Sequence, residues 1–288
     1  MKSYHDIVGD GGSQIVDQVE VQRARVADAL CDVRSIVAIG SGKGGVGKST
    51  LTMGLAGSLC RAGHAVAVLD ADLNGPSQAR LAGLEGAPLV PAADGTLAMP
   101  CNDAGIGVVS LGTLVPDTEA VQFETVAEGD SHVWRATREF AFLGQLLASV
   151  RWGKLDFLLV DLPPGAERTF QYAEFLGRDT AFVLVTIPSE LSQSVVSRSV
   201  AALVETPNPV LGYVENMSGY FCHGCGEVKP LFRVRRDVDF GIPCLGRVPF
   251  DPVLANRTAG DSSAVGSIDA IAAAIAVGVA SAAEESRS

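Results

Sequence analysis

Short apolar runs alternate with longer amphipathic stretches along most of this chain of 288 residues. The run Ser35–Ile39 is continuous, rich in β-branched residues and followed by glycine, which is typical of a strand buried on both faces. Similar runs occur at Ala65–Leu69, Ile106–Leu111, Phe157–Val160, Ala181–Ile187 and Val210–Val214. Each of these runs is predicted to be a strand.

The stretches between the apolar runs are long enough for helices. The predicted helices span Ser49–Ala62, Arg135–Val150, Thr169–Leu176, Leu191–Val204 and Ile268–Ala283. Alternating strands and helices predict an α/β fold with a doubly wound, mainly parallel sheet and right-handed crossovers. Ligands of such sheets bind beyond the carboxyl ends of the strands, so we expect the functional site there.

Residues 35–288 are predicted to form one domain, because a doubly wound sheet of this size commonly folds as a single unit. Residues 1–34 are polar and are predicted to be an N-terminal extension with a short amphipathic helix from Ile15 to Leu30. The alanine-rich end of the chain, Ala283–Ser288, is expected to fray.

A glycine-rich segment directly follows the first predicted strand and precedes the first predicted helix after it. The sequence Gly42-Lys43-Gly44-Gly45-Val46-Gly47-Lys48-Ser49 fits G-x-x-x-x-G-K-[ST] in the structural context that this motif requires. Backbone N–H groups from Gly42 to Thr50 are expected to surround the phosphates of ATP. Lys48 would add positive charge at the β and γ phosphates, and the hydroxyl of Ser49 would bind Mg²⁺.

Two acidic segments follow other predicted strands. Leu69-Asp70-Ala71-Asp72 places carboxylates at the same sheet edge as the phosphate loop, where they can hold Mg²⁺ or orient a water. Phe157-Leu158-Leu159-Val160-Asp161 is a hydrophobic strand that ends in aspartate, which is the arrangement of a Walker B element. Asp72 and Asp161 are therefore predicted magnesium ligands, and Asp72 is also predicted to be catalytic together with Lys48.

The second lysine of the loop, Lys43, gives the motif a more specific character. The segment resembles the deviant Walker A motif G-K-G-G-x-G-K-S/T of MinD, ParA, the nitrogenase iron protein and the Mrp/ApbC iron-sulfur carriers. In that class the early lysine reaches the nucleotide of the partner subunit. The resemblance therefore implies a nitrogenase iron protein-like fold, an ATP-dependent homodimer and a catalytic role for Lys43.

Further segments resemble the Mrp/ApbC branch of this class, and the likeness extends from about residue 35 to residue 260. Asp70–Ser77 is similar to its D-A-D-x-x-G-P-S segment, and Val160–Gly165 is similar to its V-D-x-P-P-G segment. Val214–Ser218 matches V-E-N-M-S, so the resemblance makes Asn216 a contact of the adenine ring.

Six cysteines are present, and only Cys222 and Cys225, in a loop near residues 217–231, have metal-ligand spacing. Two thiolates are too few for a closed tetrahedral site, and a homodimer would supply a second pair. By resemblance, the four thiolates bridge a [4Fe-4S] cluster that passes to recipient apoproteins. A zinc ion bridging the dimer is the alternative. His223, between the two cysteines, is expected to be a spacer, and the glycines and aromatics nearby indicate an open loop rather than a thioredoxin-like dithiol.

The chain also departs from the branch pattern in two places. Where the branch continues T-G-D after Gly165, this chain reads Ala166-Glu167-Arg168, so a charge pair replaces the usual carboxylate. The glycine-rich run that normally follows the cysteines is absent, and Phe232–Arg236 lies in that region.

The charge of the whole chain limits its partners. The formal net charge is -11, which disfavours unassisted binding to nucleic acid or to an anionic membrane. The first twenty residues include several acidic side chains and no continuous apolar core, so they do not form a signal peptide and a cytoplasmic location is expected.

Together, these features predict an ATP-binding and ATP-hydrolysing iron-sulfur cluster carrier. The alternatives are a dimerising switch ATPase of the MinD/ParA type and a redox ATPase like the nitrogenase iron protein. A switch of that type needs a basic amphipathic tail or a DNA-binding patch, and this acidic sequence shows neither.

Overall fold

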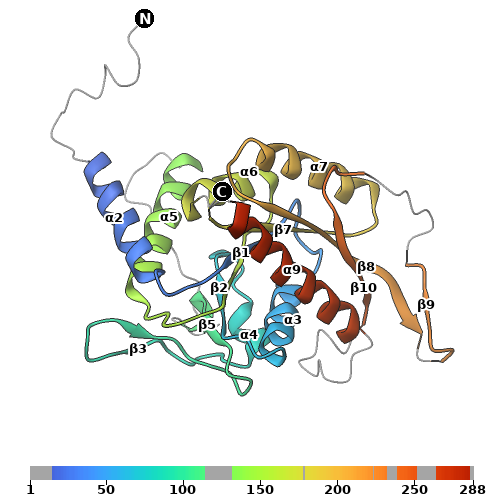
Figure 1. Ribbon diagram of the computed structural model, residues 1–288, viewed down its shortest axis with the longest axis horizontal. Helices are drawn as coiled ribbons and strands as arrows, with labels where there is room; N and C mark the ends of the chain where they lie inside the picture. The colour runs from blue at the N-terminus through green and yellow to red at the C-terminus, as the bar shows by residue number, and fades with distance from the viewer. Residues whose placement is uncertain are drawn as a thin grey trace, which may run out of the picture.

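The computed structural model describes residues 15–113, 132–177, 179–222, 224–231, 239–251 and 264–285. Its main sheet has the strand order β10-β8-β7-β1-β6-β2-β5, and β9 pairs with β8 outside this path (Figure 1). All pairs are parallel except β8 with β9. The strands are β1 (Ile36–Ser41), β2 (Val66–Asp70), β5 (Gly107–Val109), β6 (Phe157–Asp161), β7 (Ala181–Thr186), β8 (Val210–Cys222), β9 (Glu227–Lys229) and β10 (Cys244–Phe250).

Helices lie on both sides of this sheet, which confirms the predicted doubly wound α/β fold. They are α2 (Ile15–Ala29), α3 (Lys48–Arg61), α4 (Gln78–Ala82), α5 (His132–Ser149), α6 (Ala166–Leu176), α7 (Glu190–Val204) and α9 (Val265–Glu285). Every predicted strand and helix is found, with shifted ends. The sequence did not predict α4, β9, β10, or a small antiparallel pair, β3 (Val90–Pro91) with β4 (Leu97–Ala98).

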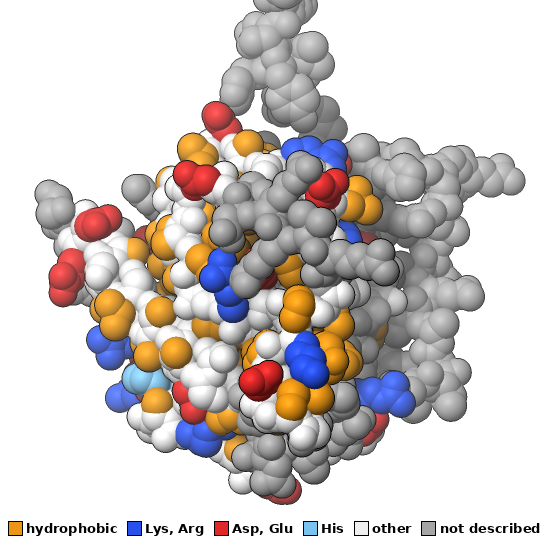
Figure 2. All heavy atoms as spheres, turned by 90° about the vertical axis from the view of Figure 1, so that its right-hand side faces the viewer, with side chains coloured by type: hydrophobic (Ala, Val, Ile, Leu, Met, Phe, Trp, Pro, Cys, Tyr) orange, Lys and Arg blue, Asp and Glu red, His pale blue; other side chains and the backbone are white. Residues whose placement is uncertain are grey.

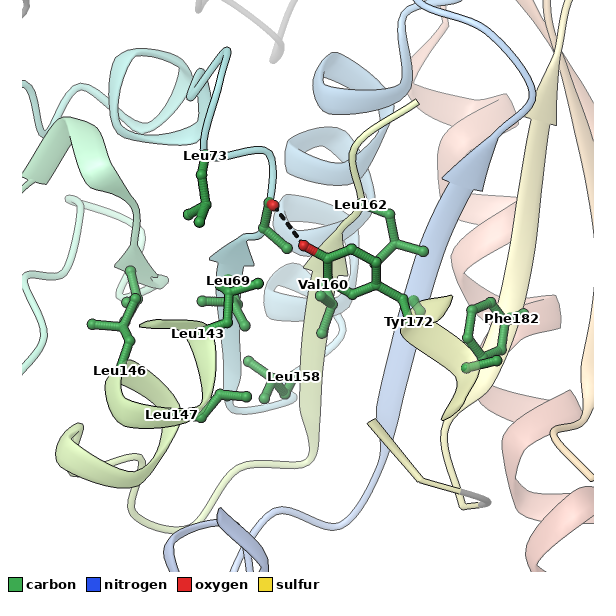
Figure 3. Close-up of a cluster of buried hydrophobic side chains, with 14 of the residues drawn as sticks. Leu69, Leu73, Leu143, Leu146, Leu147, Leu158, Val160, Leu162, Tyr172 and Phe182 are labelled. Carbon is green, nitrogen blue, oxygen red and sulfur yellow. Dashed lines mark hydrogen bonds between the residues drawn. The ribbon is translucent and has the colours of Figure 1, made fainter. Parts of the chain in front are cut away.

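Side-chain alternation along the central strands divides the core into two layers. Leu158 and Val160 of β6 face the layer formed by α5, α6 and α7, where Leu143, Leu147 and Tyr172 are buried (Figure 3). The opposite layer is formed by α3 and α9; the buried residues there include Leu159 of β6, Leu51 and Leu55 of α3, and Ile271 of α9. Burial on both faces explains why the central strands are continuous apolar runs.

The prediction for β8 was too short. The strand continues from Val214 through Glu215 and Asn216 to Cys222, and its last three residues pair with β9 in an antiparallel hairpin. The sequence after Val214 contains no continuous apolar run, because the end of β8 extends beyond the hydrophobic core. The second part is held by backbone pairing, which leaves little trace in the sequence.

The last helix, α9, is the one described helix that is long and apolar enough by composition to cross a membrane. In this fold, Ile268, Ile271 and Ile275 are buried in the layer that α9 forms with α3. Asp269 of α9 also pairs with Arg61 of α3, with 2.7 Å between its Oδ1 and the guanidinium nitrogen. Packing within the domain thus accounts for the apolar residues on one face of α9, whereas Val277 on the same helix is exposed.

The helix of the N-terminal segment, α2, packs along α5. Gln22 Nε2 donates a hydrogen bond to the carbonyl oxygen of Ala141 at 3.0 Å, and Val26 and Leu30 pack against the buried core. The predicted extension therefore includes a helix that lies on the domain.

Candidate functional site

The phosphate loop lies at the carboxyl end of β1, in the middle of the sheet, and leads into α3. Gly47 has a φ of 78°, which favours glycine, and a Cβ at this position would lie 2.3 Å from Asn216 Nδ2. A cavity of about 340 Å³ opens above the loop. Its lining includes Lys43–Thr50 of the loop together with Asp72, Ser77, Arg80, Leu81 and Pro164.

Lys48 and Asp161 form a buried ion pair beneath this cavity. The ammonium group of Lys48 donates to Asp161 Oδ1, and the side chains are 7% and 0% exposed. Thr52 Oγ1 lies 3.4 Å from the same carboxylate oxygen. Asp161 therefore holds the cation that the sequence assigns to phosphate binding.

Gln78 holds the other oxygen of Asp161, and sequence reasoning missed this residue. Its Nε2 donates to Asp161 Oδ2 at 2.7 Å and to the carbonyl oxygen of Ser49 at 3.1 Å. The side chain is fully buried, and its Oε1 has no hydrogen-bond partner among the described residues. No local sequence pattern identifies this role, because it depends on the burial of the amide, which then requires polar partners.

Asp70 organises the turn that follows β2. Its Oδ2 accepts hydrogen bonds from the backbone N–H of Ser77 at 2.8 Å, the N–H of Gln78 at 2.9 Å and Ser110 Oγ at 3.0 Å. Burial and the neighbouring charge of Asp161 raise the pKa of Asp70 to about 7, although these hydrogen bonds oppose the shift. The other oxygen, Oδ1, accepts a hydrogen bond from the N–H of Asp72. Both carboxylate oxygens of Asp70 are therefore used in hydrogen bonds within the fold.

Asp72 and Lys43, two of the predicted catalytic residues, both line the cavity. Asp72 is half-buried, and its Oδ1 accepts from the N–H of Gly75 at 3.2 Å, which fixes the start of the turn. Lys43 is also half-buried, and its ammonium group has no ion-pair partner among the residues that the structure describes. The cavity thus brings together Lys43, Ser49, Thr50 and Asp72, while Asp161 lies beneath it.

Asn216 connects the loop to β8. Its Nδ2 donates to the carbonyl oxygen of Val46 at 2.8 Å, so the side chain contacts the backbone of the phosphate loop. The next residue, Met217, has a φ of 52°, which is an uncommon conformation for a residue with a side chain. From Asn216 the strand runs six residues to Cys222, a span of roughly 20 Å in extended backbone.

The cysteine pair lies at the turn of the β8–β9 hairpin rather than in the open loop that the sequence predicted. Cys222 ends β8 and is half-buried, and Cys225 is exposed in the turn. The N–H of Gly226 donates to the carbonyl oxygen of Cys222 at 2.8 Å, and cross-strand pairing of Cys222 with Glu227 closes the hairpin. The prediction was wrong because short antiparallel pairing depends on the turn rather than on apolar residues.

Local hydrogen bonds at the turn act on the thiol of Cys222. The backbone N–H and thiol of Cys225 and the N–H of Gly224 lower the pKa of the Cys222 thiol, which favours the thiolate. No group of three or more His, Cys, Asp or Glu side chains with metal-binding geometry occurs among the described residues. In the described part of the chain, Cys222 and Cys225 are the two cysteines at this turn, and their role as metal ligands stays a prediction.

The face of the molecule on the side of β9 exposes several apolar side chains among charged ones (Figure 2). They include Tyr220, Val228, Leu231 and Phe250, which come from β8, the hairpin and β10. His223 and the segment 232–236 lie outside the described residues.

The fold and the loop define the class of protein: a P-loop nucleotide-binding protein with a deviant Walker A loop and a separate cysteine pair. Residues 32–282 match the family described as NUBPL iron-transfer P-loop NTPase, within the ParA group. The chain belongs to this family, and the resemblance to the Mrp/ApbC branch is confirmed.

Curated relatives carry consistent names. The cytosolic Fe-S cluster assembly factor CFD1 of Chaetomium globosum is 39% identical over 242 residues, covering 78% of this chain and 77% of the relative. The protein of the same name from Saccharomyces cerevisiae is 35% identical over 236 residues, covering 78% of this chain and 77% of the relative.

Solved structures give the same fold. The ADP complex of a nucleotide-binding protein from Archaeoglobus fulgidus is 28% identical, with a TM-score of 0.68, and the match covers 84% of this chain and 95% of that chain. The cell division ATPase MinD of Pyrococcus furiosus has a TM-score of 0.57 at 20% identity, which is a likeness of fold alone.

Proposed function

We propose that this protein is an ATP-dependent iron-sulfur cluster assembly factor. It binds Mg²⁺-ATP in the phosphate-loop cavity, holds a [4Fe-4S] cluster between two copies of the chain as cargo, and passes the cluster to recipient apoproteins. The observation that supports this most strongly is the connection of the two sites by one strand. Strand β8 carries Asn216 at the phosphate loop and Cys222 at its end.

The residues around the cavity fit a magnesium nucleotide. Backbone N–H groups of Gly44–Gly47 and the start of α3 suit phosphate oxygens, and Ser49 and Asp72 suit the metal ion, with Asp161 beneath them. Bound Mg²⁺ would neutralise charge on the β and γ phosphates. Lys48 leaves Asp161 for the phosphates, and the freed carboxylate stays in place because Gln78 still donates to it.

Asp72 is the proposed orienting group for the water that attacks the γ phosphate. It lines the cavity, and its turn is held by the N–H of Gly75. Lys43 is proposed to act on the nucleotide of the partner subunit in the homodimer. Its position in the cavity wall, without an ion-pair partner among the described residues, leaves its charge available for that contact.

The thiolates of Cys222 and Cys225 are the proposed cargo ligands. Four thiolates hold a [4Fe-4S] cluster, so two hairpin turns must meet for one cluster to be enclosed. An exposed turn with two cysteine ligands in the described part of each chain suits cargo that must leave again. The names of the curated relatives also agree with assembly in the cytosol, where we expect this protein to act.

The family and the names of the relatives favour the assembly function over a MinD/ParA-type switch. The likeness to MinD is one of fold, at 20% identity.

Anaerobic reconstitution of the purified protein with iron and sulfide tests this function. We expect a broad visible absorption band, and we expect the loaded protein to activate a purified apoenzyme that requires a [4Fe-4S] cluster. ATP with Mg²⁺ should change the rate of this activation in the wild type and leave it unchanged in a Lys48→Ala variant. Tight binding of zinc without any iron-sulfur absorption band would instead indicate a structural zinc ion that bridges the two chains, and the proposal would be wrong.

A further inference from the structure

The start of α6, where the sequence departs from the branch pattern, makes a contact that the sequence did not predict. Arg168 pairs with Glu139 of α5 rather than with its neighbour Glu167. The two side chains are 24% and 12% exposed, so the pair is largely shielded from water. A partly buried pair is screened by salt less than a surface pair, so its geometry is more strongly fixed.

Glu139 also contacts the turn that contains Asp72. Asn74 Nδ2 donates to Glu139 Oε1 at 3.3 Å, while Arg168 holds the other oxygen, Oε2. Asn74 lies between Asp72 and Gly75, whose N–H donates to the Asp72 carboxylate. Glu139 thus joins the first residues of α6 to the turn that bears the proposed catalytic carboxylate.

A second link joins the same two segments. Tyr172, one turn after Arg168 on α6, donates its hydroxyl to the carbonyl oxygen of Ala71 at 2.9 Å, shown by the dashed line in Figure 3. The guanidinium of Arg168 lies over the rings of Phe140 and Tyr172, at 5.7 and 5.9 Å from their centroids. Arg168 therefore packs against the side chain that makes the second link.

We propose that Arg168 and Glu139 are a positioning pair that holds the Asp72 turn against α6. Asp72 and Pro164, two residues before α6, both line the nucleotide cavity, and the N–H of Gly165 donates to the carbonyl oxygen of Ser41 at the loop. With the pair intact, the two segments move as one unit when the nucleotide binds or is hydrolysed. An acidic residue at position 168 would repel Glu139 and release the turn. This inference rests on the proposed ATP hydrolysis.

Charge reversal tests the pair. Arg168→Glu and Glu139→Arg should each lower the rate of ATP hydrolysis about 10-fold or more, because small displacements of a positioning group cost this much. ATP affinity should change by less than about 3-fold, since neither side chain contacts the proposed phosphate site. The double variant Arg168→Glu with Glu139→Arg restores the attraction and should recover most of the rate.

Glu174→Arg is the matched control, because Glu174 is exposed on the same helix, α6, and its side chain makes no hydrogen bond or ion pair with another described residue. It should hydrolyse ATP at the wild-type rate. Arg168→Gln and Glu139→Gln, which remove the charge without reversing it, should show the same direction of effect if the reversed variants fold poorly. A double variant no better than the single ones, or a control equally impaired, would overturn the proposal.

Hydrogen exchange gives a readout that does not depend on hydrolysis. Each single reversal should raise amide exchange in residues 71–77 and at the start of α6, and the double variant should lower it again. If the wild type bound no ATP, the proposed function would fail while this structural link could still be confirmed. Unchanged exchange in both single variants would refute the link itself.

Discussion

The two candidate sites differ in how completely the folded chain builds them. At the nucleotide cavity, Asp161, Gln78 and Lys48 are buried and connected by hydrogen bonds from three different elements. At the hairpin, the turn is held by two backbone hydrogen bonds to the carbonyl oxygen of Cys222, which is half-buried, and Cys225 is exposed. The cavity is preorganised by the core, whereas the proposed cargo site at the cysteine turn would need a second chain to be complete. Substitutions should therefore have coupled effects on stability and binding at the first site and separate effects at the second.

Lys48→Ala should have the largest effect. Loss of the ammonium should weaken ATP binding by at least ~100-fold, about 3 kcal/mol, because charge-assisted hydrogen bonds to phosphate are lost. It also leaves Asp161 buried without its cation, which should lower the free energy of unfolding by about 3–5 kcal/mol. Titration with labelled ATP and urea unfolding measure the two losses.

The double variant Lys48→Ala with Asp161→Asn separates these losses. It should recover much of the stability, because no uncompensated charge remains buried, while ATP binding stays weak. A Lys48→Ala protein as stable as the wild type would show that the pair does not hold the resting loop.

Gln78→Met should have a smaller effect at the same site. Removal of the amide leaves Asp161 Oδ2 and the carbonyl of Ser49 without their donor, which should cost about 1–3 kcal/mol of unfolding free energy. ATP affinity should fall as well. Without the hydrogen bond from Gln78, the Asp161 carboxylate should bind the Lys48 ammonium more strongly and leave it less available to the phosphates. Gln145→Met, at an exposed position on α5, is the matched control and should change neither quantity. Equal behaviour of the two variants would remove Gln78 from the site.

The raised pKa of Asp70 predicts a pH effect on stability in nucleotide-free and Mg²⁺-free buffer. Between about pH 4 and pH 7 the native protein holds a proton at Asp70 that the unfolded chain releases, so this contribution is present at low pH and is lost as the pH rises to about 7. The free energy of unfolding of the wild type should therefore fall more across this range than that of Asp70→Asn. Urea unfolding at several pH values measures this difference. If the free energy of unfolding changed with pH equally in the wild type and in Asp70→Asn, the raised pKa would be contradicted.

Cys222→Ser and Cys225→Ser should have the smallest effect on stability. Both side chains lie at a solvent-facing turn, so the free energy of unfolding should change by no more than about 0.5 kcal/mol. A loss of several kcal/mol in urea unfolding without metal would mean that the hairpin is part of the folded core, and the contrast between the two sites would disappear.

Sequence reasoning succeeded where a residue pattern has a direct physical cause. The continuous apolar runs predicted the central strands, and the glycines between β1 and α3 predicted the phosphate loop. It failed where tertiary contacts decide the outcome. The partner of Arg168, about thirty residues away on α5, and the bridging role of Gln78 depend on how α4, α5 and α6 pack, which no local pattern specifies. The hairpin at Cys222 was missed because its paired segments are only three residues long and form no continuous apolar run.

The central claim is that the cysteine turn completes a cargo site between two copies of a P-loop ATPase. Iron analysis of anaerobically reconstituted protein, combined with measurement of its mass in solution, tests this most directly. We predict about four irons per two chains for the wild type and for Cys244→Ser, and loss of iron in Cys222→Ser and in Cys225→Ser. Full iron content in either of these last two variants, or loss of iron only in Cys244→Ser, would contradict the account.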